Sequence, residues 1–135
     1  MKLITRDTDY AIRAICFMAR HKDQVISVNE LVRELAVPKP FLRKILQVLN
    51  KKEIVYSHKG LGGGFSLARP VDTISIMNVM EIFQGEFNLN ECHLKKNACP
   101  QQVHCPLRAK ITSLETYVAD TLEKLTIGEL LKEAV

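Results

Sequence analysis

Residues 27–51 read SVNELVRELAVPKPFLRKILQVLNK, and this stretch decides the fold. Ser27 and Glu30 form a Ser-x-x-Glu capping box, in which each side chain can bond the other residue's free backbone N–H. The helix that begins there ends at the Val-Pro pair. Pro40 then occupies the first turn of the next helix, where a missing N–H costs little, and that helix runs to about Lys51. The stretch therefore predicts two successive helices with leucine and isoleucine side chains on their inner faces.

The residues on both sides complete the pattern of a winged helix-turn-helix. Upstream, apolar residues at three- and four-residue steps predict a helix over Thr8–Arg20, capped by Asp7 or Thr8. Downstream, two short strands are predicted over Ile54–Ser57 and Phe65–Ala68, joined by a tip that holds four of the chain's six glycines. Three helices followed by a β-hairpin predict a mostly α fold with a small β-hairpin wing.

The pattern changes after the hairpin. A short helix is predicted over Ser75–Phe83. Residues 85–106 show no sustained period and are predicted to form a loop, whose conformation needs a further constraint. A long helix follows with a narrow apolar stripe formed by Leu107, Ile111, Leu114, Val118, Leu122 and Leu125. Because the chain offers no partner of matching length, this helix is expected to pair with its copy in a homodimer. The predicted divisions are a winged helix-turn-helix at 1–70, a short helix and cysteine-containing loop at 71–106, and a dimerisation helix with a C-terminal tail at 107–135.

The composition favours a globular protein with a basic and an acidic half. The 135 residues, of 15.3 kDa, are 47% hydrophobic and 25% charged. Lys and Arg outnumber Asp and Glu by 7 in residues 1–70, whereas the acidic residues are in excess by 3 in residues 71–135. We expect the basic half to bind a polyanion. Without a membrane-spanning apolar stretch or the apolar core of a signal peptide, a cytoplasmic location is expected.

The outward face of the second predicted helix in the opening stretch suits double-stranded DNA. Arg43 and Gln47 can reach guanine and adenine edges in a major groove, while neighbouring lysines meet phosphates. The glycine-rich tip can bring Lys59 and the backbone of Gly60 into an adjacent groove. A solvated charged face is the plainer alternative for such a helix. The full set of candidate DNA-contacting residues is Ser27, Lys39, Pro40, Phe41, Arg43, Lys44, Gln47, Lys51, Lys59 and Gly60.

Three of the four cysteines lie close together in the irregular segment. Cys92, Cys99 and Cys105 have the spacing C-x6-C-x5-C, and thiolates are soft ligands for zinc, copper(I) or iron–sulfur clusters. The C-x2-C pairs of zinc ribbons are absent, although His93 or His104 could complete a zinc site. Unmetallated thiols or a disulfide are further alternatives. Cys16, on the apolar face of the first helix, is interpreted as a small buried hydrophobic residue.

Several of these segments together resemble the bacterial IscR/NsrR/RirA family of iron–sulfur winged-helix regulators. The resemblance lies in Met1-Lys2-Leu3, Thr8-Asp9-Tyr10-Ala11, the wing Lys59–Phe65 and the three cysteines before a long helix. It implies a homodimer whose long helices cross, and a cluster bound by Cys92, Cys99 and Cys105. It also implies that cluster state controls promoter binding.

The resemblance leaves the fourth ligand open. IscR-like members place a His three residues after the last Cys, where this chain has Arg108. NsrR-like members use an Asp near the N-terminus of the partner chain, a place that Asp9 matches. The resemblance therefore favours Asp9, with His93 and His104 as alternatives, and a 4Fe–4S cluster over a 2Fe–2S one. A carboxylate that merely stabilises the first turn of a helix is the alternative for Asp9.

These features predict a DNA-binding transcriptional repressor rather than an enzyme, because no nucleophile–base arrangement stands out. The expected signal is iron–sulfur cluster status, nitric oxide, redox state or iron. One alternative is a zinc- or thiol-based winged-helix regulator without a cluster. A protein-interaction adaptor that uses the long helix is another.

Overall fold

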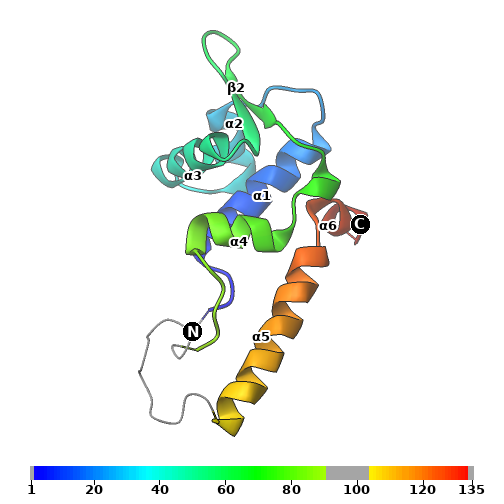
Figure 1. Cartoon of the computed structure of the whole chain (residues 1–135). Helices are drawn as coiled ribbons and strands as arrows, with labels where there is room; N and C mark the ends of the chain where they lie inside the picture. The colour runs from blue at the N-terminus through cyan, green and yellow to red at the C-terminus, as the bar shows by residue number, and fades with distance from the viewer. Residues whose placement is uncertain (1, 91–103, 134–135) are drawn as a thin grey trace.

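The computed structural model describes residues 2–90 and 104–133, and it confirms a mostly helical fold with a two-stranded wing (Figure 1). The long helix α5 extends away from the winged part, and the chain returns to it in α6 (Figure 1). Within the described ranges, no helix has the length and apolar character needed to cross a membrane. The elements are α1 (Arg6–Arg20), α2 (Val28–Leu35), α3 (Lys39–Lys51), β1 (Val55–His58), β2 (Gly64–Leu67), the 3-10 turn η1 (Val71–Thr73), α4 (Ile76–Gln84), α5 (Pro106–Lys124) and α6 (Ile127–Glu133).

The capping signals fix the helix starts, with one correction. The Ser27 hydroxyl accepts a 3.1 Å hydrogen bond from the Glu30 N–H, which confirms the predicted start of α2. Helix α1, however, is capped by Thr5 and not by Asp7 or Thr8, so it begins before the predicted boundary. Thr8 is fully buried within the first turn. The reason is a tertiary contact of its hydroxyl, described below.

A single apolar core lies among α1, α2, α3 and the base of the wing. Its apolar side chains recur at three- and four-residue steps along the helices, as predicted. Helix α4 adds a further layer through Val79 and Met80. The fully buried apolar residues of the first three helices and of the segment that enters the wing are Ala11, Ala14, Ile15, Leu31, Leu42, Leu46, Leu49 and Ile54. This core holds α3 with its opposite face toward solvent.

The wing is joined to the helices by its second strand. Strands β1 and β2 are antiparallel, with Tyr56 opposite Ser66 and His58 opposite Gly64. On its other side, β2 exchanges two 2.8 Å backbone hydrogen bonds between Phe65 and Ile26, the residue before the α2 cap. A Cβ on Gly64 would collide with the backbone of Ile26, so only glycine permits this approach. The hairpin orientation relative to α2 and α3 is therefore set by backbone contacts.

The C-terminal segment contains a helix that the sequence interpretation did not separate from the tail. Helix α5 ends at Lys124, and Ile127 N–H then donates to the Ile74 carbonyl at 2.9 Å. The Ile76 N–H donates to the Leu125 carbonyl at 2.8 Å, so residues before α4 and after α5 form a short bridge. This bridge attaches one end of α5 to the winged part.

Candidate functional site

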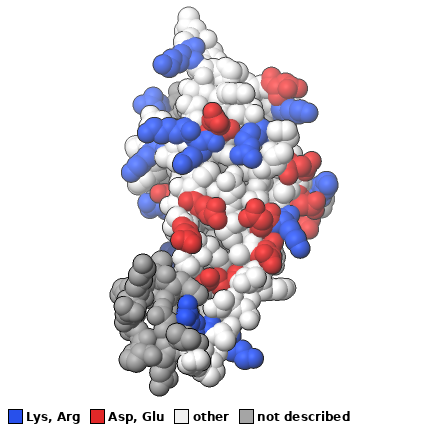
Figure 2. All heavy atoms as spheres, viewed as in Figure 1, with Lys and Arg blue, Asp and Glu red and all other residues white. Residues whose placement is uncertain are grey.

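The exposed face of α3 carries the predicted DNA-contacting residues. Leu42, Ile45, Leu46 and Leu49 are buried in the core, which turns the polar residues of the helix outward. Figure 2 shows Lys and Arg side chains gathered on the side of the molecule where α3 lies. The exposed residues of the predicted set on this helix are Lys39, Pro40, Phe41, Arg43, Lys44, Gln47 and Lys51.

A groove of about 350 Å³ lies between α3 and the wing. Arg43 and Gln47 line it from the helix, and Gly60 lines it from the hairpin. The structure thus brings together the residues predicted to contact base edges and a residue predicted to enter the adjacent groove. Lys59 is exposed beside Gly60, at the tip of the wing.

The groove also contains His58, which the sequence interpretation missed. Its Nε2 atom lies 2.8 Å from the Ser66 hydroxyl on the neighbouring strand. This cross-strand hydrogen bond fixes the imidazole at the groove wall. Ser27, by contrast, has its hydroxyl engaged in the cap of α2 and is only partly exposed.

Phe41 has a partner that the sequence did not indicate. The guanidinium carbon of Arg6 lies 4.7 Å from the centre of the Phe41 ring, a cation–π contact between the starts of α1 and α3. The Phe41 side chain is otherwise exposed, so the pair lies at the surface. Arg6 therefore extends the basic face of α3 to the beginning of α1.

The cysteine site is only partly visible in the described residues. Cys92, His93 and Cys99 lie outside them. Cys105 is the N-cap of α5, half-buried and not disulfide-bonded, and His104 is exposed in the preceding turn. Within residues 2–90 and 104–133, no three His, Cys, Asp or Glu side chains form a group that could hold a metal ion.

Asp9 is engaged in an ion pair in this structure. Its carboxylate lies 2.9 Å from the Arg13 guanidinium, one helical turn later, and its side chain is 46% exposed. This is also the arrangement of a carboxylate that stabilises the start of a helix. The role of Asp9 as a ligand remains a prediction.

Cys16 packs against the core from α1, in line with its predicted role as a small hydrophobic residue. Burial raises the pKa of its thiol, and the nearby Arg20 charge opposes this effect to a smaller extent. A raised pKa keeps Cys16 in the neutral thiol form, which is a poor metal ligand.

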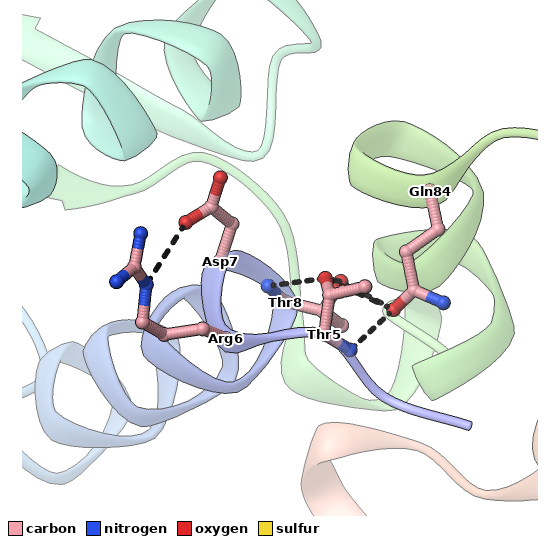
Figure 3. Close-up of polar contacts among 5 residues, drawn as sticks. All are labelled: Thr5, Arg6, Asp7, Thr8 and Gln84. Atoms are coloured by element: carbon pink, nitrogen blue, oxygen red, sulfur yellow. Dashed lines mark hydrogen bonds and ion pairs between the residues drawn. The ribbon is translucent and has the colours of Figure 1, made fainter. Parts of the chain in front are cut away.

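The amide of Gln84, the last residue of α4, binds the start of α1 (Figure 3). Its Oε1 atom accepts hydrogen bonds from the Thr5 N–H at 3.0 Å and the Thr8 hydroxyl at 2.7 Å. Its Nε2 atom donates to the Leu3 carbonyl at 3.0 Å. We call Gln84 with Leu3, Thr5 and Thr8 the Gln84 clamp. No local pattern could predict it, because Gln84 is 76 positions from Thr8 and 81 from Leu3 in the sequence.

Helix α5 presents an apolar surface that lacks a partner within the described part of the single chain. Leu107 is 69% exposed and Leu114 51% exposed, and Tyr117 beside them is 70% exposed. Leu122, at the end attached to the winged part, is only 8% exposed. The predicted stripe is thus buried at Leu122, half-buried at Ile111 and Val118, and exposed at Leu107 and Leu114.

Comparison with known proteins identifies relatives over nearly the whole chain. The family described as "Rrf2: Iron-dependent Transcriptional regulator" matches residues 4–133. A protein of Aquifex aeolicus whose name describes an HTH-type transcriptional regulator is 32% identical, over 90% of this chain and 86% of its own length. The HTH-type transcriptional regulator NsrR of Oceanobacillus iheyensis is 31% identical, over 93% of this chain and 86% of its own length.

Solved structures show the same fold. T. potens IscR superimposes with a TM-score of 0.78 at 19% identity, covering 100% of this chain and 89% of that one. CymR, the global cysteine regulator of B. subtilis, has a TM-score of 0.84 at 16% identity and covers 100% of both chains. The predicted winged-helix fold is confirmed, and the names of the relatives agree with a regulator rather than an enzyme.

Proposed function

The chain belongs to the Rrf2 family and is therefore a transcriptional regulator, and we propose that it is a homodimeric repressor whose binding to an operator depends on an iron–sulfur cluster. The observation that carries the DNA-binding part is the groove between α3 and the wing. Arg43, Gln47 and Gly60 line this groove from two elements, on the basic side of the molecule. The cysteine spacing and the NsrR relative support the sensing part.

In this proposal α3 enters the major groove of double-stranded DNA and the wing contacts the adjacent backbone or minor groove. Arg43 and Gln47 have the side chains that bind guanine and adenine edges. Lys39, Lys44 and Lys51 are exposed on the same helix and bind phosphates, which sets the affinity and its dependence on salt. Pro40 lies in the first turn of α3, where its missing N–H costs little.

The proposed dimer forms through α5. Leu107, Leu114 and Tyr117 leave large apolar side chains exposed along a helix whose other end is buried against its own chain. A second copy of the same helix would cover this surface. Two winged parts would then be held at the separation of successive major grooves on one face of DNA, about 34–36 Å.

The proposed cluster is held by Cys92, Cys99 and Cys105, with Asp9 of the partner subunit as the favoured fourth ligand. The described part of the site fits this donor set, because Cys105 is a free, partly exposed thiol at the start of a regular helix. When bound, a cluster of the favoured 4Fe–4S type would supply reactivity toward nitric oxide and oxygen and dependence on iron supply. Ligation by Asp9 would replace its present pairing with Arg13.

The decisive test combines metal analysis with operator binding. We expect anaerobically purified wild-type protein to contain iron and sulfide and to change its operator affinity when the cluster is removed. The C99A variant should lack both properties, whereas C16A should keep them because Cys16 packs against the core. Wild-type protein that stays iron-free after anaerobic reconstitution would contradict the cluster proposal and leave the assignment as a regulator intact.

A second candidate is a thiol- or zinc-based regulator without a cluster. It is favoured by His104, which is exposed in the turn directly before Cys105 and could bind a metal beside it. A zinc site would use His93 or His104 with the cysteines. Zinc without iron or sulfide, or a reversible change of operator affinity on oxidation of iron-free protein, would establish this alternative.

A further inference from the structure

The Gln84 clamp fixes the beginning of α1 on α4. One amide side chain accepts hydrogen bonds from the Thr5 N–H and the Thr8 hydroxyl (Figure 3). The same amide donates to the Leu3 carbonyl. Thr5 is also the N-cap of α1, so the clamp holds the residue from which the helix grows. Because both functional groups of the amide are used, a change of Gln84 would release several contacts at once.

Arg6 is the first residue after this held position. Its guanidinium is stacked over Phe41 at 4.7 Å, and Phe41 lies in the first turn of the recognition helix α3. Stacking on an aromatic ring restricts the side chain while leaving the edge of the guanidinium plane open to hydrogen-bond acceptors. The neighbouring Asp7 carboxylate lies 3.9 Å from Nε, at the outer limit of an ion pair.

We propose that Arg6 binds a backbone phosphate of the operator beside the first turn of α3, and that Gln84 positions it for this contact. The inference rests on the proposed DNA-binding function. Phosphates flank a recognition helix at the point where its N-terminal turn enters the major groove, and a planar arginine fork matches their geometry. Lys39 in the same turn of α3 supplies a second positive charge on this edge.

The position of Gln84 in the chain links the Gln84 clamp to the segment that contains the cysteines. It ends α4 and is followed directly by Gly85, at the beginning of the segment that leads to the cysteines. A displacement of the α4 end would therefore be transmitted through Thr5 to Arg6. Gln84 acts only through Arg6 and is a positioning residue.

The first measurement is the salt dependence of operator binding for R6Q, with R20Q as the matched control. Arg20 belongs to the same helix but lies in its last turn, at the opposite end from Arg6. Loss of one phosphate contact in each subunit lowers the slope of log K against log salt by about 1.8. If the two proteins bind equally at 1 M salt, this difference in slope makes the affinity of R6Q about 60-fold lower than that of the wild type at 0.1 M salt. R20Q should keep the wild-type slope.

The second measurement tests the role of Gln84. Q84L removes the clamp without changing the charge, so a merely structural effect would leave the salt slope unchanged. We expect its slope to fall toward that of R6Q, and the Q84L/R6Q double variant to show no further decrease. T8V removes the 2.7 Å hydrogen bond to Gln84 and the 3.1 Å hydrogen bond with the Thr5 hydroxyl, and it should lower the slope in the same direction if Q84L does not fold. Circular dichroism and urea unfolding establish that each variant is folded.

The possible outcomes distinguish the phosphate contact of Arg6, the positioning role of Gln84 and the proposed function. A wild-type slope in R6Q would show that Arg6 makes no phosphate contact and would overturn it. A reduced slope in R6Q with wild-type slopes in folded Q84L and T8V would overturn the positioning role. Failure of the wild-type protein to bind any operator would instead contradict the proposed function.

Discussion

Replacement of Gly64 by alanine tests how the wing is joined to the helices. Gly64 lies where β2 meets the backbone before α2, and a Cβ at this position would overlap the Ile26 carbonyl and approach the Ser27 Cα atom at 2.8 Å. Both neighbours are backbone atoms, which cannot move aside as a flexible side chain can. The strand must therefore shift, and the two hydrogen bonds between Ile26 and Phe65 would be lost.

The expected loss in the free energy of unfolding of G64A follows from these contacts. Two backbone hydrogen bonds contribute about 1–3 kcal/mol together, and a strained backbone adds about 1–3 kcal/mol. We therefore expect G64A to lower the free energy of unfolding by about 2–6 kcal/mol. G62A is the matched control, because Gly62 has φ +74° but open space around its Cβ position. Its cost is the left-handed backbone alone, about 1–2 kcal/mol.

Urea unfolding followed by circular dichroism measures both values. Since Ser27 caps α2, a shifted strand should also disturb the helix-turn-helix and reduce operator affinity in G64A more than in G62A. An unfolding free energy for G64A equal to or above that of G62A would refute the close-approach explanation of this glycine.

Three further variants test the proposed function. R43A should weaken operator binding by about 1–3 kcal/mol and relax the preference for one base pair, as measured by competition with substituted operators. L114E should convert the proposed dimer to a monomer in analytical ultracentrifugation, because it places a charge on the exposed part of the apolar stripe; S113E, an exposed neighbour, should not. C99A should lose iron and sulfide while its thermal unfolding midpoint stays near that of the iron-free wild type, since Cys105, which the described ranges include, is not a member of the apolar core. A normal iron content in C99A would remove Cys99 from the ligand set.

Local signals predicted the winged part well because local physics determines it. The apolar period of α1, α2 and α3 and the Ser27 cap depend on residues a few positions apart. The predicted start of α1 was wrong because of a contact with a residue that is distant in the sequence. The Thr8 hydroxyl, a candidate cap, donates to Gln84 instead, and Thr5 takes its place.

The break between α5 and α6 likewise has one cause that is local in the sequence and one that is tertiary. Thr126 and Glu129 have the spacing of a capping box, and the Thr126 hydroxyl accepts a 3.1 Å hydrogen bond from the Glu129 N–H. That signal was available in the sequence. The end of α5, however, is fixed by backbone hydrogen bonds to residues near Ile74, which only the tertiary structure brings together.

The candidate DNA-binding face was predictable, but its geometry was not. The exposed residues of α3 follow from the burial of Leu42 and Leu46 on the opposite side of the helix. Their distance from Gly60 depends on how the wing pairs with Ile26, and the contact of Arg6 with Phe41 depends on how α1 crosses α3. Neither relation has a local sequence pattern.

The two ends of α5 explain why the proposed sensor can act on DNA binding at a distance. One end begins at Cys105, and the other is attached to the winged part through Leu122 and the bridge at Thr126. A helix of 19 residues is about 28 Å long. A rotation of about 10° at one end therefore displaces the other by about 5 Å. Hydrogen bonds to base edges fail within about 1 Å, so a small rearrangement at Cys105 would suffice to break the base contact proposed for Arg43.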